Sequence, residues 1–214
     1  MRAVIFDMDG VLIDSEPLYY EVEHGIYKEL GIQVDEEVYA KYVGRSAYTM
    51  FSDLKAEFHF TDDIEDLVQK TREGIERIIT IPGKLKLMEG VIPLLQSCRE
   101  YGFKTAIASS SHYEMIHKVV DRMQIGAYFD TLVSGDFVEK GKPNPDIFLY
   151  AAKKLGIDPK ECTVIEDSAN GVEGAKKAGM KCIGFQSPST PKQDLSKADY
   201  IVSSMKEITV EMLQ

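Results

Sequence analysis

Cysteine is scarce in this chain, and its three cysteines stand far apart at Cys98, Cys162 and Cys182. Cys162 flanks one apolar strand-like run and Cys182 lies inside another. Such an odd, scattered set favours small core residues in the reducing cytoplasm over a disulfide framework. The chain also has no Cys-x-x-Cys pair and no Cys/His cluster, so the usual zinc motifs are excluded.

Long apolar runs are also missing, since no stretch approaches the ~20 apolar residues of a membrane-spanning helix. The chain begins directly with a strand-like run, and we expect no secretory signal. Basic residues are in deficit: 25 Lys and Arg stand against 35 Asp and Glu, a formal net charge of −10. We therefore expect no nucleic-acid or membrane partner. An anionic small ligand would need a metal ion, a lysine or helix N-termini to bind it.

The remaining composition, 44% apolar and 28% charged over 214 residues, is that of an ordinary globular protein with one large or two small domains. We expect it to act as a monomer. Residues 16–80 have helical patterns and no convincing strand. One stripe of apolar residues recurs at every fourth position from Leu18 to Leu30, and Gly31 is suited to the C-cap. Further helices are predicted at 35–43, 46–58 and 61–80, which together favour a small bundle.

From Pro82 onward, short apolar runs alternate with helical segments. This alternation favours an α/β fold with a mostly parallel sheet covered on both faces. Strands are predicted at residues 4–6, 104–108, 129–134, 163–165, 181–185 and 200–202. Helices are predicted at residues 91–101, 109–124, 145–155 and 170–178. The helical block therefore interrupts an α/β domain directly after its first strand.

Two acids follow the first strand in the run Asp7-Met8-Asp9-Gly10. The apolar run before them is typical of a strand that is buried on both faces. Open α/β sheets form their sites at the carboxyl ends of such strands, and a spacing of two on a strand puts both side chains on one face. Taken alone, the pair is explained equally well as turn acids before a glycine.

Three later segments carry further polar groups at strand or loop ends. They are the serines 109–111, Lys142 in a Gly-Lys-Pro-Asn-Pro-Asp loop, and the pair Glu166-Asp167. Each alone has a simpler explanation, as an N-cap, a solvated lysine or helix-start acids. If their strands are neighbours in one parallel sheet, all of them converge at one edge. The combination then describes a phosphate site with a hard divalent cation.

The chemistry of each group fits that interpretation. Carboxylates of Asp7 and Asp167 can hold Mg²⁺, which reduces the repulsion between an attacking carboxylate and a phosphate. The hydroxyl of Ser109, the amides near Ser110 and the Lys142 ammonium can bind phosphoryl oxygens. One carboxylate can attack phosphorus to form an aspartyl-phosphate, and a second can act as general acid and base.

As an ordered set, these motifs resemble those of the haloacid dehalogenase-like (HAD) hydrolase superfamily, in particular its β-phosphoglucomutase-like branch. They stand here as Asp7-Met8-Asp9-Gly10-Val11-Leu12-Ile13-Asp14-Ser15-Glu16, Ala108-Ser109-Ser110-Ser111, Gly141-Lys142-Pro143-Asn144-Pro145-Asp146 and Ile165-Glu166-Asp167-Ser168. The resemblance covers essentially the whole chain. It implies a Rossmann-like parallel-sheet core, residues 1–15 and 81–214, with a small helical-bundle cap, residues 16–80, inserted after the first strand.

The resemblance also implies roles for the motif residues. Asp7 would be the nucleophile and Asp9 the general acid/base. Mg²⁺, which Mn²⁺ or Co²⁺ could replace, would be bound by Asp7, the Asp9 carbonyl and Asp167, with Glu166 adjacent. Phosphate would be bound by Ser109, Ser110 and Lys142. Dehalogenases of the superfamily need neither the second acid nor a metal, so Asp9 and the pair Glu166-Asp167 favour a phosphoester substrate.

The cap differs from that of β-phosphoglucomutase itself. The mutase has a histidine where Tyr19 falls here, and an arginine where Ala47 falls after Gly44. These differences favour hydrolysis over return of the phosphoryl group, and hence a Mg²⁺-dependent phosphatase of small phosphorylated carbohydrates. Arg45 is a candidate contact for substrate, or else a surface helix-start residue, and Glu16 a candidate contact for a sugar hydroxyl. The four histidines, His24, His59, His112 and His117, are expected at the surface or on helices rather than in catalysis.

Two alternatives stay open. A mutase of the β-phosphoglucomutase type would use the same core and return the phosphoryl group to another hydroxyl. A phosphorylatable receiver-type regulator also combines an acid cluster, a phospho-accepting aspartate and a lysine. Receivers lack the ~65-residue helical insertion that the pattern predicts here, and their acceptor does not follow the first strand. A degenerate binding protein is disfavoured, because no motif position is missing.

Overall fold

A six-stranded parallel sheet forms the centre of the computed structural model, which describes residues 2–214. The strand order is β3-β2-β1-β4-β5-β6, and every neighbouring pair in it is parallel. The strands are β1 (Ala3–Phe6), β2 (Lys104–Ser109), β3 (Thr131–Ser134), β4 (Cys162–Glu166), β5 (Lys181–Phe185) and β6 (Tyr200–Val202). This architecture confirms the predicted α/β class.

Strand β1 lies between β2 and β4, and all four of its residues are buried. Its side chains alternate between two apolar clusters, as the pleat of a strand requires. Val4 and Phe6 belong to the cluster on one face, and Ala3 and Ile5 to the cluster on the other. The continuous apolar run therefore marks a strand buried on both faces, as predicted.

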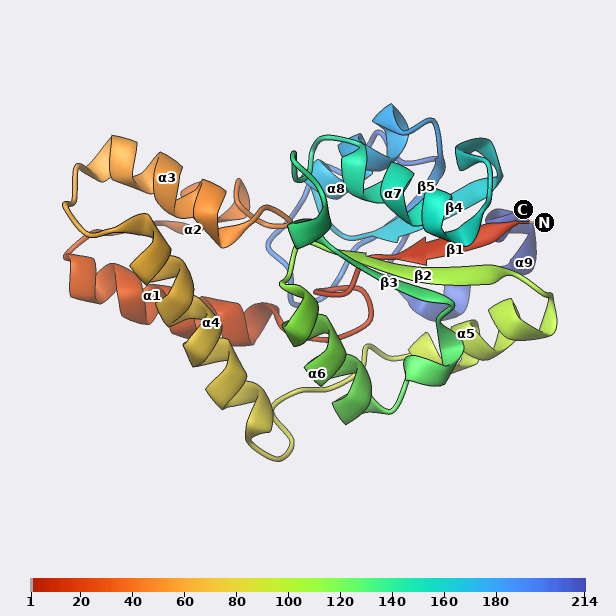
Figure 1. Cartoon of the computed structure of the whole chain (residues 1–214), viewed down its shortest axis with the longest axis horizontal. Helices are drawn as coiled ribbons and strands as arrows, with labels where there is room; N and C mark the ends of the chain where they lie inside the picture. Colours follow the sequence, from red (N-terminus) through yellow and green to blue (C-terminus); the bar gives the residue numbers. More distant parts are fainter. Residues whose placement is uncertain (1) are drawn as a thin grey trace.

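Helices cover both faces of the sheet (Figure 1). Helices α5 (Val91–Glu100), α6 (Tyr113–Met123) and α9 (Val210–Leu213) pack on one face. Helices α7 (Asp146–Leu155) and α8 (Ala169–Lys177) pack on the other. Short 3₁₀ turns stand at η1 (Gly126–Tyr128), η2 (Gly135–Phe137), η3 (Pro159–Glu161) and η4 (Met205–Glu207). The predicted helices and strands are found within a few residues of their expected bounds, with one exception: the helix expected from Ser109 begins at Tyr113.

Four helices follow the first strand: α1 (Glu16–Leu30), α2 (Glu36–Ala40), α3 (Ala47–Phe58) and α4 (Ile64–Thr80). We call them the cap helices. Figure 1 shows them grouped beyond the carboxyl ends of the strands, at the opposite end of the molecule from both chain termini. They enclose an apolar cluster of their own, formed by Ile26, Tyr27, Val34, Tyr39, Val43, Met50, Phe51, Leu54 and Leu67. The boundaries of two separate domains remain a prediction.

Local signals explain where the cap helices begin and end. The side chains of Asp35, Ser46 and Asp63 accept hydrogen bonds from the first free N–H groups of α2, α3 and α4. Gly31 ends α1 in the left-handed conformation, with φ of 68°, as a C-cap glycine does. Helix positions were therefore readable from the sequence even where the tertiary arrangement was not.

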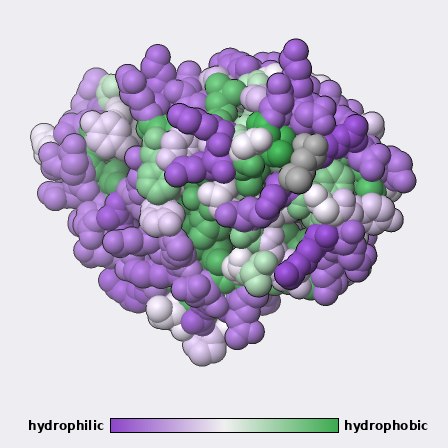
Figure 2. Space-filling model, turned by 45° about the vertical axis from the view of Figure 1, so that its right-hand side comes forward, coloured by the Kyte–Doolittle hydropathy of each residue, from purple (hydrophilic) through white to green (hydrophobic). Residues whose placement is uncertain are grey.

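The surface is largely hydrophilic on the face that Figure 2 shows, with hydrophobic residues in patches between the hydrophilic ones. Within residues 2–214, no helix has both the length and the apolarity that a membrane crossing needs. Cys98, Cys162 and Cys182 are buried free thiols, which confirms their predicted place in the core. Location in the cytoplasm and the monomeric state remain predictions.

Two neighbouring residues of α7 test the packing of the sheet. Phe148 is fully buried in the cluster under α7 and α8, whereas Leu149 is 39% exposed. We expect Phe148→Ala to lower the free energy of unfolding by about 3–5 kcal/mol, because it leaves a cavity. Leu149→Ala should change it by less, within about 1 kcal/mol. Urea unfolding followed by circular dichroism measures both, and equal effects would contradict this account of the core.

Candidate active site

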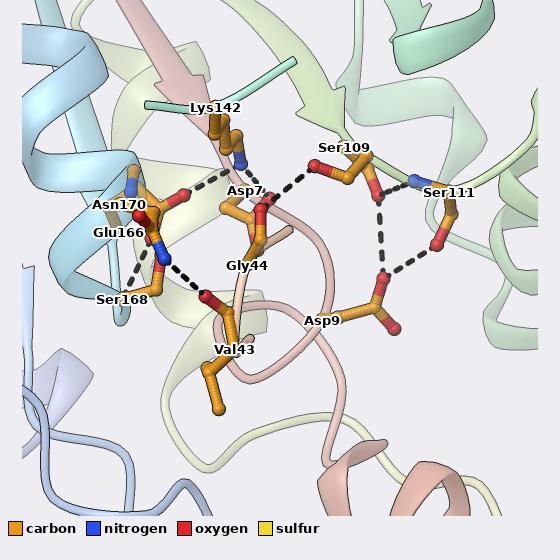
Figure 3. Close-up of polar contacts among 12 residues, drawn as sticks. Asp7, Asp9, Val43, Gly44, Ser109, Ser111, Lys142, Glu166, Ser168 and Asn170 are labelled. Atoms are coloured by element: carbon orange, nitrogen blue, oxygen red, sulfur yellow. Dashed lines mark hydrogen bonds and ion pairs between the residues drawn. The ribbon is translucent and has the colours of Figure 1, made fainter. Parts of the chain in front are cut away.

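The predicted polar groups meet at one edge of the sheet. Strands β2, β1 and β4 are neighbours, and their carboxyl ends lead to Ser109, Asp7 and Glu166. The backbone N–H of Asp7 donates to the carbonyl of Ile165 at 3.0 Å, so the pairing of β1 with β4 continues past the end of β1. Figure 3 shows these side chains pointing toward one another. The predicted convergence is therefore present.

Lys142 is buried between two of the acids. Its Nζ lies 2.5 Å from Asp7 Oδ1 and 2.6 Å from Glu166 Oε1, and its side chain is 1% exposed. Burial alone would lower the pKa of Lys142, but the two carboxylates outweigh it and raise that pKa above its usual value. The simpler interpretation of Lys142 as a solvated loop lysine is wrong.

Asp7, Glu166 and Asp167 form a compact carboxylate cluster, with one oxygen of each within 4.8 Å of the others. Burial raises the pKa of Asp7 and Asp167, the neighbouring carboxylates add to the increase, and Lys142 opposes it at Asp7. If all three acids were ionised, the single ammonium would leave excess negative charge in a buried place, which is why the pKa values rise without a cation. Oxygen donors in this state fit a hard divalent cation.

Glu166 has a different environment from the other two acids. Its Oε1 accepts from Lys142, and its Oε2 accepts from the backbone N–H and the hydroxyl of Ser168 at 2.8 and 3.0 Å. A Cβ at Gly171 would lie 1.7 Å from Glu166 Oε1, so helix α8 approaches this carboxylate closely only because position 171 is glycine. Both oxygens of Glu166 are thus occupied, and Asp7 and Asp167 are the acids better placed to hold a cation.

Asp9 is surrounded by hydroxyl groups. Its carboxylate accepts hydrogen bonds from Ser15 at 2.6 Å, Ser111 at 2.9 Å and Ser109 at 3.4 Å. Burial raises its pKa, and these hydroxyls partly offset the increase. Strand β1 ends at Phe6, so the expectation that Asp7 and Asp9 share one face of a strand is wrong. Both lie in the loop after it, where the chain turns and gives the two acids different neighbours.

The serine triplet forms the end of β2 and the loop after it. Ser109 is the last residue of β2, and its hydroxyl accepts from the backbone N–H of Ser111 at 3.1 Å. Helix α6 begins only at Tyr113, after an N-cap at His112. The amides near Ser110 therefore belong to a loop and not to a helix N-terminus, which corrects the prediction.

The loop between α2 and α3 lies directly on the core. The Ser110 hydroxyl donates to the Gly44 carbonyl at 3.1 Å, and Asn170 Nδ2 donates to the Val43 carbonyl at 3.1 Å (Figure 3). Gly44 has φ of 76°, and a Cβ there would lie 2.2 Å from Ser168 Oγ. Glycine is required at this position for the cap helices to approach the core so closely.

A cavity of about 430 Å³ lies between the cap helices and the sheet edge. This volume suits a small molecule. Its wall includes the following predicted site residues and cap positions: Asp7, Asp9, Glu16, Tyr19, Arg45, Ala47, Ser109, Ser110 and Asp167. Lys142 and Glu166 stand behind that wall, in contact with Asp7. The structure therefore brings the catalytic candidates and the cap candidates to one cavity.

The three cap residues proposed to affect substrate binding differ in whether their polar atoms already have partners. Arg45 Nη1 pairs with Asp53 Oδ2 at 3.0 Å, and its guanidinium lies over the ring of Tyr42. Tyr19 shares a hydrogen bond with Ser111 Oγ at 3.2 Å. Glu16 is buried, its Oε2 has no hydrogen-bond partner, and burial raises its pKa to about 7, with Asp9 adding to the increase. Of the three, Glu16 and Arg45 each have a buried polar atom without a hydrogen-bond partner, Oε2 and Nε respectively.

Several wall residues were not predicted from the sequence: Glu23, Tyr39, Arg72, His112 and Asp136. Arg72 Nη2 lies 2.6 Å from His112 Nε2, and His112 Nδ1 lies 2.8 Å from Asp136 Oδ1. These contacts join residues far apart in the sequence, and no motif marks them. Thr190, from the loop after β5, was also missed although it donates to Asp167.

Comparisons with known proteins agree with this geometry. A family model described as haloacid dehalogenase-like hydrolase matches residues 1–179. The chain is 34% identical to the phosphorylated carbohydrates phosphatase of Thermotoga maritima, over 86% of this chain and 84% of that protein. It is 29% identical to the β-phosphoglucomutase of Bacillus subtilis, over 100% of this chain and 94% of that protein. The crystal structure of CbbY from Rhodobacter sphaeroides in complex with phosphate superposes with a TM-score of 0.85 at 25% identity, covering 100% of this chain and 99% of that one.

The carboxylate cluster predicts how a divalent cation affects stability. With the pKa of Asp7 and Asp167 raised in the folded state, the metal-free protein binds more protons than the unfolded chain above about pH 4, so it loses stability as pH rises. A cation must displace those protons, and its contribution should therefore grow with pH.

We expect Mg²⁺ to raise the Tm over that in chelator, and to do so by a larger margin at pH 8 than at pH 5. Thermal unfolding followed by circular dichroism across this range measures the difference. Asp167→Asn is the matched control and should reduce the Mg²⁺ effect at both pH values. A Mg²⁺ effect that is largest at pH 5 would contradict the assignment.

Proposed function

Because the chain belongs to the haloacid dehalogenase-like hydrolase family, we propose that it is a Mg²⁺-dependent phosphatase that hydrolyses small phosphorylated carbohydrates through an aspartyl-phosphate. Hydrolysis of phosphoric monoesters agrees with the phosphatase among its relatives. One observation carries the proposal: Asp7 and Asp9 line one cavity but have different surroundings. Asp7 contacts a buried ammonium, whereas Asp9 contacts three hydroxyls.

This difference supports separate chemical roles for the two acids. The Lys142 ammonium favours the ionised form of Asp7, which is the form that attacks phosphorus. Burial favours the protonated form of Asp9, which is the form that can give a proton to a leaving alcohol. Burial raises the pKa of Asp7 as well, to about 8, and the Lys142 ammonium opposes that rise, so the direct contact with an ammonium is what distinguishes Asp7 from Asp9.

In the proposed reaction, a carboxylate oxygen of Asp7 attacks phosphorus, and the bond from phosphorus to the carbohydrate oxygen breaks. Asp9 gives its proton to that oxygen, and the alcohol leaves. Asp9 then takes a proton from a water molecule, which attacks phosphorus, and the bond to Asp7 breaks to release phosphate. The hydroxyls of Ser109 and Ser110 and the Lys142 ammonium would bind the phosphoryl oxygens. A divalent cation, held by Asp7, the Asp9 carbonyl and Asp167, would supply charge neutralisation when bound.

We further propose that residues 16–80 act as a cap on a core formed by residues 1–15 and 81–214. The separate apolar cluster within the cap helices supports this division. The cavity lies between the two parts, so closure of the cap would separate a bound substrate from bulk water. Glu16 and Arg45, on the cap side of that cavity, would then contact the carbohydrate.

One observation favours the mutase alternative. Arg72 lines the cavity and is bonded to His112, and among residues 2–214 it has no carboxylate partner. A cation of this kind could hold the second phosphate of a bisphosphate intermediate. Against it, the positions where the mutase carries its histidine and arginine are Tyr19 and Ala47, neither of which is cationic, and Arg45 is already paired with Asp53. Hydrolysis is therefore the better supported reaction.

The test of the function is free phosphate release from a panel of sugar phosphates in the presence of Mg²⁺. Conversion of β-glucose 1-phosphate to glucose 6-phosphate is measured in parallel. We expect phosphate release without isomerisation. Isomerisation that exceeds phosphate release, and that requires a sugar bisphosphate, would replace the phosphatase with the mutase.

The roles of the two acids predict different kinetic losses. Asp7→Asn should lower kcat by roughly 10⁴-fold or more, because it removes the nucleophile. Asp9→Asn should slow both formation and hydrolysis of the phosphoenzyme by about 10²- to 10⁴-fold. Rapid-quench measurement of phosphoenzyme separates the two steps, and circular dichroism verifies the fold. Asp62→Asn, at an exposed position, is the control. Unchanged turnover in Asp7→Asn would remove Asp7 from the nucleophile role.

A further inference from the structure

Helix α1 presents two buried carboxylates to the cavity. Glu16 and Glu23 are seven residues apart, which is two helical turns, so both lie on the same side of α1. Their exposed fractions are 9% and 6%, and both line the cavity wall. Tyr39, from α2, lines the same wall, and its phenol lies close enough to both glutamates to lower their pKa values. The motif residues of the core do not include Glu23 or Tyr39.

A purely structural role does not account for this pair. Buried carboxylates in folded proteins are paired with cations or fully hydrogen-bonded, because an unpaired buried charge is costly. Within the described chain, no cation contributes to the pKa of either glutamate, and Glu16 Oε2 has no hydrogen-bond partner. Burial raises the pKa of Glu23 to about 8, and the proximity of Glu16 adds to that increase. An unpartnered carboxylate oxygen on a cavity wall indicates that a ligand supplies the missing hydrogen-bond donor.

Hydroxyl groups are the donors that this wall fits best. Two carboxylates and a phenol offer several acceptors and at least one donor, which matches the alternating hydroxyls of a carbohydrate chain. A cationic ligand is less suited, because the guanidinium groups of Arg45 and Arg72 line the same cavity. The phosphate would lie in the same cavity, beside Asp7 and Ser109.

We propose that Glu23, together with Glu16 and Tyr39, binds hydroxyl groups of the substrate and makes the enzyme selective for polyhydroxylated phosphate monoesters over plain aryl ones. This inference rests on the proposed phosphatase function and names its substrate class. In this proposal, Glu23 and Tyr39 determine substrate specificity and take no part in the transfer of the phosphoryl group.

The experiment compares two esters, glucose 6-phosphate and p-nitrophenyl phosphate, with the full-length protein and Mg²⁺. We expect Glu23→Gln to lower kcat/KM for the sugar phosphate by about 10- to 100-fold, mainly through KM, since an acceptor oxygen on the cavity wall is replaced by an amide donor. For p-nitrophenyl phosphate, which has no hydroxyls, kcat/KM should change less than about threefold. Tyr39→Phe should show the same selectivity with a smaller loss.

Glu21→Gln is the matched control, because Glu21 lies on the same helix but is exposed and pairs with Lys84. It should leave both substrates unaffected. If Glu23→Gln fails to fold, Tyr39→Phe removes a single oxygen and carries the same test.

Equal losses for both esters, or no loss for either, would overturn the inference while leaving the phosphatase function in place. A loss confined to glucosamine 6-phosphate, added as a third substrate, would also overturn it, because the pair would then bind an ammonium. Failure of the unmodified protein to hydrolyse either ester would count against the proposed function first and remove the inference with it.

Discussion

The contact of the Lys142 ammonium with Asp7 and Glu166 is the interaction on which the rest of the site depends. It joins three segments far apart in the sequence, and each has to be positioned by the sheet before the contact can form. Breaking a buried pair leaves an uncompensated charge, which typically costs several kcal/mol. The pairing of β1 with β4 beyond the strand ends brings Asp7 beside Glu166, and glycine at position 171 lets α8 approach them.

This contact explains why the buried charges belong to the core, whereas the cap helices form a separate apolar cluster. The core holds a fixed arrangement of charge, in which Glu166 is saturated by Lys142 and Ser168, and Asp7 and Asp167 remain available to a cation. The cap helices pack around a cluster of their own and meet the core through short contacts such as Ser110 with Gly44.

The sequence predicted most of the core, because its signals are local. The apolar run before Asp7 indicated a doubly buried strand, and the alternation after Pro82 indicated a mostly parallel sheet, so convergence of the motif residues was expected if their strands were neighbours. Two predictions were wrong because they depended on the exact ends of elements. β1 ends before Asp7, and α6 starts four residues after Ser109. The proximity of Tyr39 to Glu16 and Glu23 and the contact of Arg72 with His112 left no local signal, because they depend on how the cap helices are placed against each other and against the core.

Under the proposed function, the cap rather than the core would decide between a phosphatase and a mutase. Both reactions need the same nucleophile, acid/base and cation ligands, and they diverge only in which oxygen attacks the phosphoenzyme. A mutase has to keep a doubly charged sugar phosphate near Asp7 while it turns over, which requires cations on the cap side of the cavity. Here that side carries the buried acids Glu16 and Glu23, and of its two guanidinium groups one is paired with Asp53. Acidic residues on this wall accept hydrogen bonds from hydroxyl groups more readily than they retain a second phosphate, which agrees with the proposed hydrolysis of a carbohydrate phosphate.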